Sequence, residues 1–334
     1  MKFSELSERE KIDTIEVLHT RTGQLEVVIE KDWWVTTVLR ALFAMPYAAH
    51  LSFKGGTSLS KCWNLIQRFS EDCDIAVNRE FLGFNGTLSK TQISDRLRRA
   101  SCSFVRERLQ FDLAQRLEAD GVNPALFSVK VNITPITTTD PEIIEIIYQT
   151  LFIESAYIQP VIRLEISGRS MNEPLQIVKL RSMLDESYPD APFAESPFFV
   201  QAVVPQRTFL EKICLLHEEF AKPSDNMRTE RLSRHLYDLA RIADTPIAEE
   251  ALTDKQLFHS VVEHRRVFIG LKGFDYDTLT QGSIVIVPPD KIIAQWKDDY
   301  ETMRHTMIYG NSLPFNQLID KIKSLNEKIN NSKF

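Results

Sequence analysis

Two short motifs, separated by a spacer of helix length, constrain this chain more than any other feature. The first motif joins two glycines to two hydroxyl residues and runs Phe53-Lys-Gly-Gly-Thr-Ser-Leu-Ser-Lys61. Glycines before an apolar-periodic run predict a tight turn that opens a helix, where unpaired backbone N–H groups face an anion. We therefore expect the phosphate-binding residues to be Gly55, Gly56, Thr57 and Ser58.

The second motif is Asp72-Cys-Asp-Ile-Ala-Val77. Its apolar residues predict a strand, on which Asp72 and Asp74 point to one face and Cys73 points to the other. Two carboxylates on one face repel each other, and a shared divalent metal ion relieves that repulsion. Each motif alone is also typical of an ordinary turn. A phosphate-binding turn close to a metal-binding pair, however, is typical of the active sites that transfer phosphoryl or nucleotidyl groups.

The two motifs resemble the signature of the polymerase-β-like nucleotidyltransferases, and more closely that of their AbiEii/AbiGii toxin branch. The resemblance includes Arg68-Phe-Ser-Glu-Asp-Cys-Asp-Ile75 and extends to residues 29–35, 210–212, 236–239 and 296–303, so that it spans nearly the whole chain. It implies an α+β fold with a mixed sheet, flanking helices and a helical C-terminal domain. The expected nucleotidyltransferase domain is 1–200, with N-terminal helices in 1–47 and the catalytic sheet in 48–200. The helical domain is expected at 205–334.

A third acid is expected on a later strand. Residues 161–167 alternate in polarity and place Glu165 between apolar neighbours, where an ionised carboxylate is costly unless it is paired or metal-bound. The resemblance implies that this strand lies beside the Asp-x-Asp strand, which makes Asp72, Asp74 and Glu165 the predicted metal ligands and catalytic acids. The alternative is a Glu165 on an exposed face, paired with Arg163 or another cross-strand cation.

The C-terminal half supplies the remaining candidates. The helix predicted at 206–220 carries Lys212, which the resemblance identifies as the residue that holds the nucleotide phosphates, although a lysine on a helix is usually solvated. The next helix carries Arg234-His-Leu-Tyr-Asp238, where the family more often has Lys-Asp-x-x-Asp. Asp238 is retained as a nucleotide-binding residue, whereas the roles of Arg234 and His235 stay open.

Local patterns give further expectations. Helices are predicted at 5–21 and 29–44, with Glu30-Lys31-Asp32 as the N-terminal turn of the second and with Trp33 and Trp34 as packing residues. A strand is predicted at 128–134, and 141–154 fits either a strand or a helix. Residues 169–205 are rich in proline and predict a loop-rich boundary between domains.

Composition restricts the class of protein. With 334 residues and 43% hydrophobic content, the chain has enough material for two domains and a large core. No apolar run approaches the roughly 20 residues of a membrane span, and the charged N-terminus lacks a signal-peptide core, so a cytoplasmic protein is expected. The net charge of −6 excludes a generally basic surface. A local concentration of arginines remains either an RNA contact or a solvated helix face: Arg96, Arg98, Arg99, Arg106 and Arg108.

The sequence therefore predicts a nucleotidyltransferase that uses Mg²⁺ or Mn²⁺ to transfer a nucleoside monophosphate from a nucleoside triphosphate to a hydroxyl group, releasing pyrophosphate. The resemblance implies an RNA acceptor, with the end of a tRNA as the specific expectation. It also implies a toxin or phage-defence role and a cognate antitoxin encoded nearby. Alternatives are a small-molecule or protein acceptor, and an inactive module that binds nucleotide or RNA. The nucleotide, the oligomeric state and direct antitoxin binding are left open.

Overall fold

The computed structural model describes residues 1–70, 72–131, 141–153, 158–171 and 173–332. The chain divides into two compact units. Unit 1 contains Met1–Cys62 and Ser70–Ala202, and unit 2 contains Trp63–Phe69 and Val203–Phe334. The chain thus leaves unit 1 after the glycine motif and returns to it just before the Asp-x-Asp motif. We refer to the intervening segment, Trp63–Phe69, as the strap.

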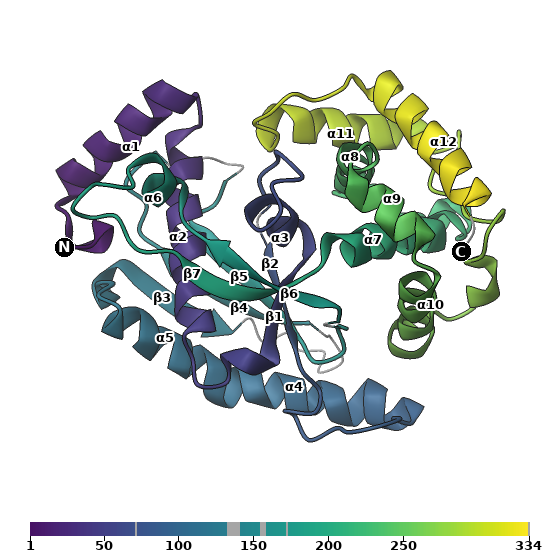
Figure 1. Ribbon diagram of the computed structural model, residues 1–334, viewed down its shortest axis with the longest axis horizontal. Helices are drawn as coiled ribbons and strands as arrows, with labels where there is room; N and C mark the ends of the chain where they lie inside the picture. Colours follow the sequence, from purple (N-terminus) through teal and green to yellow (C-terminus); the bar gives the residue numbers. More distant parts are fainter. Residues whose placement is uncertain (71, 132–140, 154–157, 172, 333–334) are drawn as a thin grey trace. The chain divides into compact units, whose positions relative to one another are not determined.

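Unit 1 is built on a mixed sheet (Figure 1). Its described strands are Leu51–Lys54 (β1), Asp72–Val77 (β2), Phe127–Val131 (β3), Glu142–Tyr148 (β4), Val161–Ser167 (β5), Leu175–Leu180 (β6) and Phe198–Val203 (β7). They lie in the order β3-β4-β5-β2-β1-β7-β6. Strand β2 runs parallel to β5 and antiparallel to β1, and β1 runs parallel to β7. Both sequence motifs therefore meet at the centre of the sheet.

Unit 1 also contains the helices that flank this sheet in the sequence. They are Glu8–Thr22 (α1), Glu26–Phe43 (α2), Gly55–Lys61 (α3), Arg98–Phe104 (α4), Gln110–Ala119 (α5) and Met183–Ser187 (α6). Two π-helical stretches, Gln92–Leu97 and Val105–Leu109, make α4 and α5 parts of one long helical run. Helix α2 contacts both α5 and β5, so its apolar side chains form the core with the sheet.

The expected start of the second helix was wrong. Helix α2 begins at Glu26, and Glu30, Lys31 and Asp32 lie in its interior, all at most 6% exposed. Their charges are satisfied by polar groups of other segments: the Thr150 hydroxyl and the Leu151 N–H donate to Glu30, Lys31 donates to the Gln159 carbonyl, and Asp32 accepts from Lys61 and the Met183 N–H. The three residues therefore anchor α2 to the segments around the sheet.

The proline-rich region 169–205 is more regular than expected. It contains β6, α6 and β7, and its prolines lie outside the two strands, where no ladder hydrogen bond is lost. In the range 141–154, which fits either a strand or a helix, residues 142–148 form strand β4. Residue 154 lies outside the described residues. The predicted strand 128–134 is seen as β3, and residues 132–134 lie outside the described residues.

Unit 2 is mainly helical. Its longer helices are Pro205–Phe220 (α7), Ser233–Ile242 (α8), Pro246–Thr253 (α9), Lys255–His264 (α10), Ile293–Thr306 (α11) and Phe315–Asn331 (α12). Helix α7 contacts α8, α9 and α10, while α8 also contacts α11 and α12. Helices α7 and α8 are consequently the centre of this unit. Over the described chain, no helix is both long and apolar enough to cross a bilayer.

Candidate active site

The glycine turn lies directly against the second aspartate of strand β2. The antiparallel pairing of β1 with β2 places Lys54 opposite Asp74, and the chain turns into α3 at Gly55, whose φ is +77°. A Cβ atom on Gly55 would overlap Oδ2 of Asp74 and lie 2.7 Å from its Cγ. Glycine is therefore required here both for the backbone conformation and for the close approach of the carboxylate.

The two hydroxyl residues of the turn hold it in place. The Thr57 hydroxyl donates to the backbone carbonyl of Asp72, and the Ser58 hydroxyl donates to the carbonyl of Gly55 at 2.9 Å. Both side chains are buried. Because these hydroxyl hydrogens are used within the protein, the backbone N–H groups of the first turn are the donors better suited to an anion.

Three acidic residues share one face of the sheet. Strands β2 and β5 are parallel, and their register places Asp74 beside Glu165 and Asp72 beside Arg163. Side chains aligned in this way point to the same face. All three acidic side chains are partly exposed, whereas Cys73 and Leu164, on the opposite face, are fully buried. Burial and the adjacent aspartates raise the pKa of the Cys73 thiol to about 12, so it stays protonated.

The chemistry of this face suits a divalent cation, because Mg²⁺ and Mn²⁺ prefer carboxylate oxygens. Among the described residues, however, no three His, Cys, Asp and Glu side chains form a group that could hold a metal ion. The shared face of Asp72, Asp74 and Glu165 is thus established, while the three-ligand metal site stays a prediction.

Arg163, the alternative partner of Glu165, makes an ion pair with a different residue. Arg163 lies directly opposite Glu145 on β4, and its Nε is 3.2 Å from a Glu145 carboxylate oxygen. Such a cross-strand ion pair is a common way to stabilise a partly exposed sheet face. Arg163 is therefore engaged with strand β4.

Lys212 belongs to a buried cluster within unit 2, which we call the Arg68 cluster: Arg68, Lys212, His235 and Asp238. The Asp238 carboxylate is completely buried and accepts two hydrogen bonds from Arg68, at 2.7 and 2.8 Å. Its Oδ2 also lies 2.9 Å from Nζ of Lys212, and that nitrogen is 3.2 Å from Nδ1 of His235. A lysine ammonium is only a donor, so Nδ1 of His235 is the acceptor.

Burial and the neighbouring charges shift the pKa values of this cluster, and for Lys212 and Asp238 the two effects partly oppose each other. Burial lowers the pKa of Lys212, an effect that Asp238 offsets and that Arg68 reinforces. Burial and the neighbouring Lys212 hold the pKa of His235 well below its usual range, so the imidazole is neutral. Burial alone would raise the pKa of Asp238, but Arg68 and Lys212 outweigh it and keep the carboxyl ionised.

Asp238, the predicted nucleotide-binding residue, is engaged with two cations of the protein itself. Both of its carboxylate oxygens accept from cations, and its side chain has no exposed surface. A buried carboxylate between two cations is part of the protein's own ion-pair network. Asp238 therefore pairs with Lys212 and Arg68, and its contact with the nucleotide stays a prediction.

Comparison with known proteins identifies the family. Residues 37–322 match the family model described as nucleotidyl transferase AbiEii toxin, type IV TA system. The chain belongs to this family. It is accordingly a nucleotidyltransferase that uses a nucleoside triphosphate, and the family is that of the toxins of type IV toxin–antitoxin systems.

The fold of this AbiEii family member is similar to that of MenT4, a nucleotidyltransferase toxin from Mycobacterium tuberculosis H37Rv. The TM-score is 0.57, the likeness covers 98% of this chain and 91% of that chain, and the sequence identity is 15%. At that identity the likeness supports the fold alone, and the predicted α+β nucleotidyltransferase fold is confirmed. No curated protein is similar enough in sequence to be matched with this chain.

Sequence patterns assign no role to Arg68, although it stands inside a motif of the AbiEii resemblance. Its partner Asp238 lies 170 positions away in the chain, and no local pattern connects the two residues. The signal that could have found it is an arginine close to the Asp-x-Asp motif with the apolar residues Ile66 and Phe69 on either side.

The arginine-rich segment of this family member makes ion pairs with its own acidic residues. Arg98 is 5% exposed, and Arg106 contacts the buried Glu142 through two hydrogen bonds. Arg99 pairs with Asp95 at 2.8 Å, and Arg108 pairs with Asp112 at 3.4 Å. These contacts favour a structural role for the segment over an RNA contact.

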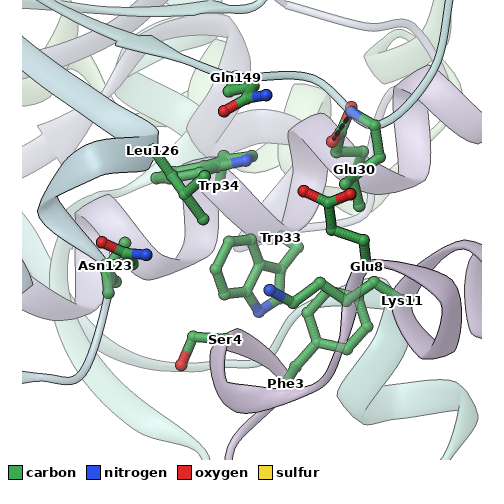
Figure 2. A pocket seen from close by; sticks show the side chains of 12 residues that line it. Phe3, Ser4, Glu8, Lys11, Glu30, Trp33, Trp34, Asn123, Leu126 and Gln149 are labelled. Carbon is green, nitrogen blue, oxygen red and sulfur yellow. Dashed lines mark hydrogen bonds between the residues drawn. The ribbon is translucent and has the colours of Figure 1, made fainter.

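None of the three acidic residues Asp72, Asp74 and Glu165 lines the pocket that is found in unit 1. Figure 2 shows the residues that line it. Trp33 and Trp34 form its aromatic wall, together with Phe3, and its charged groups come from Glu8, Lys11 and Glu30. The two tryptophans are at most 7% exposed, and their rings pack edge to face at 5.1 Å. Their expected packing role is confirmed, although they also line a cavity.

Proposed function

We propose that this AbiEii protein transfers a nucleoside monophosphate from a nucleoside triphosphate to a hydroxyl group of RNA, with the end of a tRNA as the preferred acceptor. The observation that carries the proposal is the placement of Asp74 against the Gly55 turn, with Glu165 beside it in register. A turn that offers N–H donors next to carboxylates brings phosphate and metal-ligating groups to the same position.

Asp72, Asp74 and Glu165 would hold Mg²⁺ or Mn²⁺, which when bound supplies charge neutralisation for the triphosphate. The turn of Gly55 and Gly56 binds the β- and γ-phosphates through its N–H groups. Glu165 is the carboxylate proposed to accept the proton of the attacking hydroxyl. In the reaction the acceptor oxygen forms a bond to the α-phosphorus, the bond from that phosphorus to the bridging oxygen breaks, and pyrophosphate leaves.

Lys212 is proposed to bind the triphosphate as a point charge. Support comes from its charge balance, because Asp238 is shared with Arg68 and His235 is neutral. The consequence for the cell is proposed to be growth arrest, which a cognate antitoxin encoded nearby relieves.

Incubation with each α-labelled nucleoside triphosphate, total RNA and Mg²⁺ tests the proposal, with the labelled product then separated into RNA, protein and small molecules. We expect label from one preferred nucleotide in the tRNA fraction. Label in the protein or small-molecule fraction would show that the acceptor is a protein or a small molecule and not RNA. Nucleotide binding without any transfer would indicate an inactive module.

A further inference from the structure

The Arg68 cluster has an unbalanced charge. Arg68 and Lys212 each carry a positive charge, Asp238 carries the one negative charge among the four side chains, and the His235 imidazole is neutral. Arg68 is 2% exposed and Lys212 is 7% exposed, so water does little to screen either charge. The four side chains together keep a surplus of one positive charge in the interior of unit 2.

The geometry assigns the carboxylate mainly to Arg68. Nε and Nη2 of Arg68 contact both oxygens of Asp238, which is the bidentate arrangement that favours arginine over lysine. Lys212 reaches only one of those oxygens. Lys212 therefore has a partner that keeps it in position but does not cancel its charge.

The strap holds Arg68 firmly in this position. The Phe69 N–H donates to the Met307 carbonyl at 2.7 Å, and the Tyr309 N–H donates to the Gln67 carbonyl at 3.1 Å. The Gln67 N–H also donates to the hydroxyl of Tyr237, the residue next to Asp238. These bonds fix the backbone on both sides of Arg68, so its guanidinium is oriented before any ligand binds.

We propose that Arg68 is a positioning residue which, by binding Asp238, keeps the charge of Lys212 available for the triphosphate. This rests on the proposed function, in which Lys212 binds the phosphates. The charged and titratable groups that face Lys212 come from two elements. The strap contributes Arg68, and helix α8 contributes Arg234, His235 and Asp238. Without Arg68, Asp238 would pair with Lys212 alone and neutralise it.

The sign of the pH effect follows from the same contacts. Lys212 must be protonated to bind a phosphate, so nucleotide binding is lost as the pH rises through its pKa. Removing Arg68 takes away a repelling charge and leaves Asp238 entirely to Lys212, which raises that pKa. Removing the charge of Asp238 has the opposite effect. The two variants should therefore move the basic limb of the pH profile in opposite directions, which general destabilisation does not do.

The test compares Arg68→Gln, Arg68→Lys and Asp238→Asn with the parent chain. The readouts are the KM and kcat for nucleotide transfer, the binding of a non-hydrolysable nucleoside triphosphate from pH 6 to 10, and the thermal midpoint. Arg265→Gln is the matched control, because Arg265 makes a bidentate pair with the buried Glu218 in the same unit. Assays are run well below the lowest midpoint of the set.

For Arg68→Gln we expect a KM raised by about tenfold, the effect of about 1.4 kcal/mol of lost attraction, and a basic limb moved upward by about one pH unit. Arg68→Lys should lie between this variant and the parent, and Asp238→Asn should move the limb downward. Arg265→Gln should lower the midpoint alone. If the basic limb of the pH profile for nucleotide binding does not move in the Arg68 and Asp238 variants, the inference is overturned. A parent chain that binds nucleotide but transfers none contradicts the proposed function, and the binding profiles still test Arg68.

Discussion

Gly55 and Asp74 are in such close contact that no side chain fits between the turn and the carboxylate. A Cβ on Gly55 would overlap Oδ2 of Asp74, and the φ of +77° already disfavours other residues. The strand register brings Glu165 to the opposite side of the same aspartate. Asp74 is thus the residue around which the phosphate-binding and metal-binding parts of the proposed site are arranged.

The first prediction concerns Gly55→Ala. The left-handed backbone costs about 1–2 kcal/mol with a side chain, and the overlap must also displace the Asp74 carboxylate. Gly23→Ala is the matched control, because Gly23 has a φ of +72° and open space around its Cβ position. We expect both variants to have lower thermal midpoints but only Gly55→Ala to lose nucleotide transfer. Equal transfer by the two variants would remove the turn from the site.

The second prediction concerns Lys212→Ala. Asp238 keeps its two hydrogen bonds to Arg68, so the variant should fold, while loss of the positive charge should slow transfer to any acceptor by roughly 10² to 10³. Lys222→Ala, which removes a partly exposed partner of Glu219, is the control. A rate within a factor of two or so of the parent would mean that Lys212 does not act on the triphosphate.

The third prediction concerns Arg106→Ala. Its loss leaves the carboxylate of Glu142 buried without this cation, which should destabilise unit 1 by about 1–3 kcal/mol. Since the arginine is used in an ion pair, RNA affinity and its dependence on salt should not change. A salt slope smaller by about one unit, the signature of a lost phosphate contact, would restore the RNA-binding interpretation.

The fourth prediction concerns acid stability. Arg68 and Lys212 outweigh the effect of burial and hold the pKa of Asp238 below its usual range. The stability it contributes is present above the unfolded pKa of about 3.9 and is lost as the pH falls through the lower folded value. The midpoint of the parent should therefore fall more steeply between pH 5 and 2 than that of Asp238→Asn. Parallel curves would contradict this.

Local signals predicted the centre of the sheet. Glycines, a following apolar period and alternating polarity place the turn at Gly55 and put Asp72 and Asp74 on one face, and these features depend on neighbouring residues only. The strand of Glu165 was predicted in the same way. Its position beside Asp74 came from the family resemblance, because pairing between distant strands leaves no local pattern.

The remaining features depend on contacts over long distances in the chain. The ion pair of Arg68 with Asp238 joins the strap to α8, and the assignment of the strap to unit 2 follows from contacts that no spacing reveals. Charged residues are usually exposed, so the pattern of Glu30, Lys31 and Asp32 predicts a helix start and not a buried stretch of helix. Their partners come from other segments, which only the folded structure brings near.

The most direct test of the central claim is label transfer from an α-labelled nucleoside triphosphate to RNA, measured side by side for the parent chain and Asp74→Asn. The substitution keeps the shape of the side chain against Gly55 and removes one of several neighbouring negative charges. The thermal midpoint should therefore be unchanged or higher, while transfer should be abolished. Transfer by Asp74→Asn at close to the parent rate with Mg²⁺ present would contradict the account.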